Sequence, residues 1–330
     1  MKPARTFLLA GALALLGGGA QAAVSCSATM SQVAFGNVDL LEGTDMTATG
    51  TLSYTCTNDD RFNAVRVNLC LLIDGGQGSQ AQFQPRFMRD GAGNALPYNL
   101  FLPGGVLWTT NGYGYATPYS PPVFTIAAAP FVGGVASASG SVAITGRMLA
   151  TPTSASPGSY AVGFGGGSTS VAWEWSNTRA AAPASCGGNQ PVRFPFAVSA
   201  TVVPRCQVQV DTLDFGVGGL LTANVDAASS LRATCTLRTP YQIGLDNGQN
   251  ALGNVRRMAG PGGDFISYEL YRDSARTQRW GNAVGVDTLS TGTIGSGAAT
   301  SHTLWGRVPP QAVSPTPGNY SDTVTVTVTY

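Results

Sequence analysis

The chain contains one series of landmarks twice, and this internal repeat limits its possible folds more than any other feature. Each copy opens with a cysteine pair, Cys26 and Cys56 in the first and Cys206 and Cys235 in the second. The later landmarks keep their order in both copies: Val33-Ala34-Phe35-Gly36 and Leu213-Asp214-Phe215-Gly216, Ile73-Asp74-Gly75-Gly76 and Leu245-Asp246-Asn247-Gly248, Arg86-Phe87-Met88 and Arg256-Arg257-Met258, Pro157-Gly158-Ser159-Tyr160 and Pro317-Gly318-Asn319-Tyr320. The order indicates two tandem domains of one fold.

The pattern within each copy predicts an all-β structure. Short runs of alternating apolar and polar residues are separated by Gly, Pro, Asn and Asp, which is typical of strands joined by tight turns. No convincing amphipathic helix follows the N-terminal segment. We therefore expect two tandem immunoglobulin-like Greek-key β-sandwiches.

The two copies differ in the length of chain after their closing tyrosine. Forty-four residues separate Tyr160 from Arg205, whereas only ten residues come after Tyr320. The second sandwich is thus expected to lack its final strand, and to accept one from another chain. The acceptor-groove strand is predicted within Gly318 to Tyr330, with these residues on one face: Val324, Val326, Val328 and Tyr330. Closure of the second domain by its own strands is the alternative.

The strand that completes the first copy must come from residues 161–204. Thr169 to Trp175 and Val192 to Val203 both alternate. The second segment is favoured because it leads directly into Cys206.

The N-terminus predicts a secretory signal peptide over residues 1–22. Lys2 and Arg5 precede an apolar run, and Ala20-Gln21-Ala22 is a small-residue cleavage site. The remaining chain is divided into an N-terminal domain, 23–204, and a C-terminal domain, 205–330. Only three residues would precede Cys26 after cleavage, too few for a donor strand. The chain is therefore expected to accept a strand without offering one.

Export favours oxidation of the six cysteines. Cys26 is expected to pair with Cys56, and Cys206 with Cys235, because each pair opens one copy. Cys70 and Cys186 then remain to pair with each other. Free buried thiols are the alternative.

Composition argues against several classes of function. Charged residues make up 11% of the chain and the net charge is +1, so no basic footprint for nucleic acid is present. No catalytic, metal-binding or cofactor-binding residue is predicted. His302 is the only histidine, and no nucleophile-elbow motif accompanies it. Asp246 to Asn250 faintly resembles a calcium loop, but a plain turn is favoured.

The paired landmarks resemble the spore coat protein U domain, which also builds the subunits of archaic, Csu-type chaperone–usher pili. Two tandem copies resemble the two-domain tip adhesin of such pili, which implies that 23–204 is an adhesin domain and 205–330 a pilin domain of the spore coat protein U type. The resemblance implies export through the periplasm to the cell surface, at the pilus tip. It also implies a periplasmic chaperone, an outer-membrane usher and a neighbouring subunit that donates an N-terminal strand. A secreted structural coat protein outside any pilus is the alternative.

The first copy has apolar runs broken by Gly and Pro, which predict loops with hydrophobic tips. Such loops would attach the cell to hydrophobic surfaces and support biofilm formation. The candidate adhesive residues are Phe101, Leu102, Val106, Leu107, Trp108, Phe131, Val132, Phe164, Val171 and Trp173. Tyr113, Tyr115 and Tyr119 form a further aromatic stretch. The alternative is that these residues form the core of an enlarged sandwich.

Overall fold

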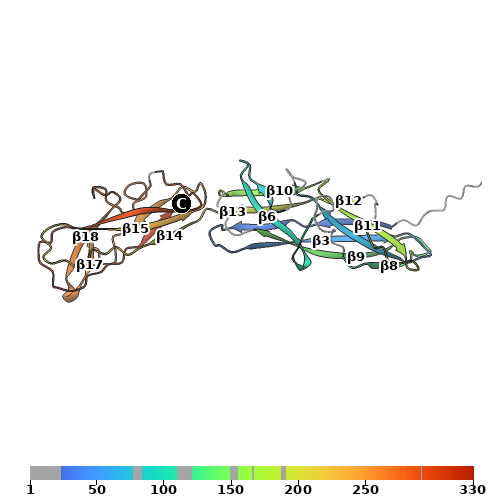
Figure 1. Ribbon diagram of the computed structural model, residues 1–330, viewed down its shortest axis with the longest axis horizontal. Helices are drawn as coiled ribbons and strands as arrows, with labels where there is room; N and C mark the ends of the chain where they lie inside the picture. The colour runs from blue at the N-terminus through green and yellow to red at the C-terminus, as the bar shows by residue number, and fades with distance from the viewer. Residues whose placement is uncertain are drawn as a thin grey trace, which may run out of the picture.

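The computed structural model describes residues 24–76, 84–109, 121–148, 155–165, 167–186, 191–290 and 292–330. Two β-sandwiches lie end to end, domain one on the right and domain two on the left of Figure 1. The predicted signal peptide and the tyrosines at 113, 115 and 119 lie outside the described residues. Within the described ranges, no helix is long and apolar enough to cross a membrane.

Domain one consists of two sheets around one core. Adjacent strands of the larger sheet are, in order, β1 (Val24–Met30), β3 (Met46–Asn58), β9 (Ala136–Met148), β6 (Ala95–Leu102), β5 (Arg86–Arg89), β10 (Gly158–Phe164), β13 (Phe196–Val202) and β2 (Val33–Val38), with β7 (Val106–Leu107) beside β6. The smaller sheet contains β12 (Val192–Arg193), β11 (Thr169–Asn177), β4 (Val65–Ile73) and β8 (Phe124–Ile126). A short 3-10 turn, η1 (Pro103–Gly105), joins β6 to β7.

Domain two is smaller and has its own core. One sheet has the order β14 (Cys206–Val210), β15 (Val225–Cys235), β19 (Ala299–Val308), β18 (Phe265–Tyr271) and β17 (Arg256–Ala259), and a second pairs β16 (Gln242–Leu245) with β20 (Val326–Thr329). The turn η2 (Pro261–Gly263) lies between β17 and β18. The all-β, two-sandwich prediction is confirmed. The proposed boundary at 204/205 lies between the two hydrophobic cores.

All three predicted disulfides are present. Cys26 and Cys56 are directly opposed on β1 and β3, and Cys206 and Cys235 on β14 and β15. Cys186, which follows β11, is bonded to Cys70 of β4.

The strand that completes domain one is β13, within the segment favoured from the sequence. It pairs antiparallel with β10 and parallel with β2. Phe196, Val198, Ala200 and Val202 alternate into the core along it. The other candidate segment forms β11, which pairs with β4 in the smaller sheet. Alternation alone could not separate the two, because both strands bury one face.

The predicted terminal strand of domain two is shorter than expected. Regular pairing covers only β20, opposite β16. Before it, Ser321 forms a bridge with Ala259 of β17, in the other sheet. The chain therefore crosses from one sheet to the other between Ser321 and Val326, which interrupts the regular ladder.

Candidate functional sites

Domain two contains an equivalent of β10, the strand that pairs with β13 in domain one. The Tyr160 hydroxyl donates to the Ser156 carbonyl at 2.8 Å, and the Tyr320 hydroxyl donates to the Thr316 carbonyl at the same distance. Ala161 pairs with the last residue of β5, as Ser321 pairs with the last residue of β17. The segment that begins at Gly318 is therefore the structural counterpart of β10.

The segment on the other side of β13 is repeated as well. A Cβ atom placed on Gly146 would lie within 3 Å of Val33 and Phe35. One placed on Gly306 would lie within 3 Å of Leu213 and Phe215. Each glycine, having no side chain, lets the segment that packs against it come close. Since Gly306 contacts Leu213 and Phe215 as Gly146 contacts Val33 and Phe35, Leu213 to Gly216 is the counterpart of β2.

Nothing among the described residues occupies the position of β13 between these two segments of domain two. Residues 211–224, all of them described, contain no strand. In domain one, β2 is a strand because it pairs with β13. The matching segment of domain two has no such partner among the described residues, and so it forms no ladder. The exposure of the residues after these segments also differs as expected from the absence of that strand. Leu40 is 5% exposed in domain one, whereas its counterpart Leu220 is 78% exposed.

We call the apolar residues at this position the open edge. They are half-buried and pack against the core of domain two: Leu213, Phe215, Tyr320, Val324, Val326 and Val328. In domain one the counterparts Val33, Tyr160 and Phe164 are fully buried because β13 covers them. The open edge thus exposes apolar surface that one more strand would cover.

Polar contacts hold one side of the open edge in place. Asp322 accepts a hydrogen bond from the Tyr268 hydroxyl at 2.7 Å and another from the Asn250 side chain at 3.0 Å. Burial raises the pKa of Tyr268, so its hydroxyl stays protonated and remains a donor. The Phe215 ring packs edge-on against Tyr268, with ring centroids 6.1 Å apart.

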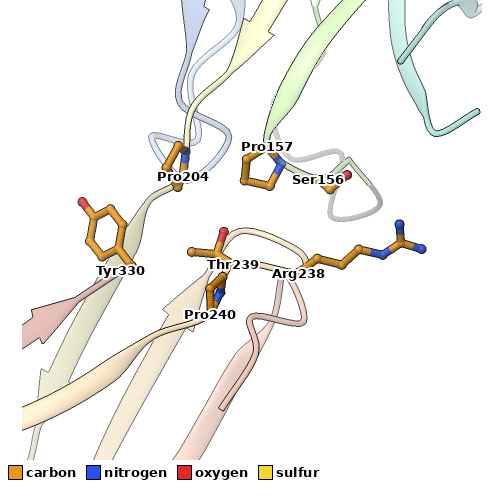
Figure 2. A pocket seen from close by; sticks show the side chains of 7 residues that line it. All are labelled: Ser156, Pro157, Pro204, Arg238, Thr239, Pro240 and Tyr330. Atoms are coloured by element: carbon orange, nitrogen blue, oxygen red, sulfur yellow. The ribbon is translucent and has the colours of Figure 1, made fainter. Parts of the chain in front are cut away.

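Tyr330 lies apart from the other three residues of the predicted acceptor strand. It is exposed and lines a cavity of about 360 Å³ between the domains. Figure 2 shows Ser156, Pro157 and Pro204 on one side of this cavity and Thr239 and Pro240 on the other. A hydrogen bond to Tyr330 and the charge of Asp39 raise the pKa of Arg205. Tyr330 therefore belongs to the domain junction.

A second site is a loop cluster at the end of domain one that lies away from domain two (Figure 1). The rings of Phe62 and Phe131 meet edge to face with centroids 5.9 Å apart, although Phe62 is 81% and Phe131 70% exposed. Val132 and Val135 are exposed beside Phe131 in sequence, around Gly133 and Gly134, whose φ angles are 59° and 106°. We call these four apolar residues the tip cluster: Phe62, Phe131, Val132 and Val135.

A buried polar network supports the tip cluster. The Asn58 amide is fully buried and donates to the carbonyls of Asn63 and Ala127, both at 2.9 Å. Asp60 accepts from the backbone N–H of Phe62 at 2.7 Å. The Asn63 side chain donates to Asp60 at 2.9 Å, and this bond makes the largest contribution to lowering the pKa of Asp60. The two loops are therefore fixed to one another, and the phenyl rings are held in solvent.

Five predicted adhesive residues belong to the core instead. They are Leu102, Trp108, Phe164, Val171 and Trp173. Trp108 explains the error, because its indole donates to the Leu71 carbonyl at 3.2 Å and its own carbonyl accepts from Arg86. Trp280 and Arg256 repeat this arrangement in domain two, with bonds of 2.8 Å. Trp108 is thus a repeated core element, and the expectation of an exposed tip is corrected for these five.

The other predicted adhesive residues lie nearer to solvent. Phe101 and Leu107 are half-buried, and Val106 is exposed at the start of β7, directly after η1. Phe131 and Val132 lie in the tip cluster. Phe62 was missed, although it follows the turn-forming run Asn58 to Asp60, a usable signal for an exposed loop.

The sequence of this chain matches the model of a known protein family. The Spore Coat Protein U domain matches residues 12–162 and 192–327. The chain belongs to the Spore Coat Protein U domain family. Protein U of Myxococcus xanthus is 33% identical over 132 residues, which cover 36% of this chain and 72% of Protein U.

The Spore Coat Protein U architecture also has a solved counterpart. A chain in the crystal structure of the CsuC–CsuE chaperone–tip adhesion subunit pre-assembly complex, from archaic chaperone–usher Csu pili of Acinetobacter baumannii, aligns with a TM-score of 0.53. The alignment covers 93% of this chain and 100% of that chain at 18% identity. The two proteins therefore share a fold.

Ionisable groups in this Spore Coat Protein U chain serve structural contacts. The His302 imidazole lies 3.1 Å from the Tyr241 hydroxyl, and burial lowers its pKa. Asp246 accepts from the N–H groups of Gly248 and Thr325. Among the described residues, no group of three or more His, Cys, Asp or Glu side chains could hold a metal ion.

Proposed function

We propose that this protein is a tip adhesin of a chaperone–usher pilus, in which domain one attaches the cell to surfaces and domain two joins the fibre. The observation that carries the proposal is the contrast between the domains: β13 completes domain one, whereas domain two has an open edge at the same position. The shared fold with a tip adhesion subunit agrees with it.

The open edge is the proposed acceptor site for a donor strand. By the example of β13, the donor runs antiparallel to the segment after Gly318 and parallel to Leu213–Gly216. Burying each apolar donor side chain contributes about 1.5–3 kcal/mol. Ordering the donor strand offsets a large part of this gain. Before assembly, a periplasmic chaperone supplies a temporary strand, and the usher then exchanges it for the neighbouring subunit's N-terminal strand.

A strand-addition experiment tests the acceptor role of domain two. The probe is a synthetic peptide with the N-terminal extension of the neighbouring fibre subunit, and the control is the same peptide with its alternate apolar residues replaced by Ser. At 100 times its dissociation constant, the probe is expected to raise the unfolding free energy of domain two by about 2.7 kcal/mol. Domain one should not change. A chain that is fully stable alone and indifferent to the peptide contradicts the proposal.

The tip cluster is the proposed adhesive surface. Its four residues are apolar and exposed, and the Asn58–Asp60 network holds two of its loops together. A preorganised apolar surface loses little conformational entropy on contact, and binding through it requires no particular polar group on the target. The proposed targets are therefore hydrophobic surfaces, including those on which biofilms form.

Attachment of cells to plastic tests the adhesive role. The double variant Phe62→Ser, Phe131→Ser is expected to reduce attachment several-fold while the amount of surface fibre stays constant. The control is Val284→Ser, Val286→Ser, which removes two exposed apolar side chains from domain two. Equal attachment of cells carrying either variant would show that the tip cluster is not the adhesive surface.

A secreted coat role is the second candidate, favoured by the 33% identity to Protein U of Myxococcus xanthus. It predicts cell-surface protein without fibres, and no dependence on an usher. Deleting the usher should abolish surface display of a pilus adhesin and leave a coat protein in place.

A further inference from the structure

The contact between the two domains supplies a template for a second contact farther along the fibre. Three residues, Val203 to Arg205, join β13 to β14. On the domain-one side, Asp39 pairs with Arg205 at 2.9 Å, and the Leu41 carbonyl accepts from the Gln207 side chain at 3.1 Å. Ser156 and Pro157, which precede β10, line the cavity at the junction together with Thr239 of domain two. Domain two therefore sits against the segment that follows β2 and the one that precedes β10.

The counterparts of these two segments lie together at the other end of domain two. The Gln311 N–H donates to the Leu221 carbonyl at 2.9 Å, which joins the segment after Gly216 to the segment after β19. Thr316 donates to the Asp264 carboxylate through both its N–H and its hydroxyl, at 2.8 and 2.6 Å. Asp264 lies between β17 and β18, which Figure 1 draws at the end of domain two farther from domain one.

The two segments that meet at this end carry apolar side chains, whereas the segment that follows β2 in domain one carries Asp39 and Glu42. Val217, Leu220 and Val313 are strongly exposed on it, and we call them the base surface. The position of Asp39 is taken by Gly219, and residues 217–224 and 312–317 contain no charged side chain. A partner that covers the base surface therefore needs an apolar face opposite Val217, Leu220 and Val313.

We propose that the base surface seats the folded body of the next fibre subunit, a second Spore Coat Protein U-type domain stacked on domain two as domain two is stacked on domain one. The inference rests on the proposed function, because the donor strand places that body. A donor with the polarity of β13 leaves the open edge beside Leu220, just as β13 leaves domain one beside Leu40 and reaches the next domain within three residues. The contact between domains one and two and the contact between domain two and the next subunit then have the same geometry. An ion pair stabilises the first, and apolar side chains stabilise the second.

Site-specific photo-crosslinking in cells that assemble the fibre tests the stacking. The photoreactive residue p-benzoylphenylalanine replaces Val217 or Val313 in the full chain. Val324 on the open edge reports the donor strand, and Val284 is the exposed apolar control. After irradiation, fibres are sheared from the cells and the crosslinked peptides are identified by mass spectrometry.

Val217 and Val313 are expected to give several-fold more crosslinked product than Val284, with a different chain of the family and within its folded body. Val324 should crosslink within that chain's N-terminal extension. Crosslinking at Val324 with only control levels at Val217 and Val313 overturns the stacking and leaves the proposed function intact. Control levels at all positions overturn both. Products formed at the base surface only with a second copy of this chain, or only with a chaperone, also overturn the stacking.

Discussion

Each domain has a buried arginine that ties several backbone carbonyls together, and in domain two this residue is Arg256. Its guanidinium is fully buried and donates to the carbonyls of Leu245, Asp246 and Trp280. It is also paired with Glu269. A buried cation is tolerated only when its donors are satisfied in this way. Arg86 occupies the same position in domain one, where it donates to the carbonyls of Asp74 and Trp108.

Replacing Arg256 should therefore destabilise domain two strongly. Arg256→Met removes the buried one of the two arginine partners of Glu269, the other being Arg279 at 2.9 Å, and leaves several buried carbonyls without donors. We expect the unfolding free energy to fall by about 3–5 kcal/mol, measured by urea denaturation. Arg232→Gln is the control, because the Arg232–Asp211 pair is solvent-exposed at 3.4 Å and should cost at most about 1 kcal/mol. Similar losses in both variants would contradict the role assigned to burial.

Single aromatic residues were the least predictable feature of the site. Trp108 and Phe62 both occur beside turn-forming residues, yet one is fully buried and the other exposed. The difference depends on a hydrogen bond to a strand 37 residues away in sequence, which no local pattern encodes. The repeat does contain a signal for a shared position, since a tryptophan follows the Tyr-x-Leu strand in both copies, Trp108 in one and Trp280 in the other.

At the scale of elements, β13 decides the state of its neighbours. It gives β2 its ladder and covers the apolar face of β10. The Phe196 ring stacks on Phe164 with centroids 4.6 Å apart and lies near Trp108 at 6.0 Å. The order of landmarks in the sequence predicted this strand and its missing counterpart. The exact strand limits near Gly318 could not be predicted, because they depend on where the chain changes sheets.

Weakening β13 should weaken domain one alone. Phe196→Ala removes the stacked ring and is expected to cost domain one about 3–5 kcal/mol of unfolding free energy. Domain two should keep its stability, since the two cores are separate. Urea unfolding followed by domain-specific hydrogen exchange distinguishes the two transitions. Phe62→Ala, at an exposed phenylalanine, is expected to stay within about 0.5 kcal/mol of the parent; an equal effect of the two changes would contradict the assignment of β13.

At the scale of the whole molecule, a polar contact spans the junction between the domains. Arg205 joins Asp39 of domain one to Tyr330, the residue after β20. The Arg205 side chain is half-exposed, so salt screens this contact.

Arg205→Gln is expected to leave the stability of both domains unchanged and to broaden the distribution of distances between them. Double electron–electron resonance between one spin label on each domain measures this distribution. In the parent protein, raising the salt concentration should broaden it in the same direction. A distribution that ignores both changes would show that Arg205 does not fix the junction.

The short connection from β13 to β14 has a mechanical consequence. A pull on domain two enters domain one through Val203 to Arg205 and acts along the axis of β13. Hydrogen bonds in a sheet run across the strand direction, and β13 has such rows on both edges. A lengthwise force must therefore shear both rows together, whereas a sideways force could open them one bond at a time. Tension along the chain is thus resisted by the strand that closes the fold.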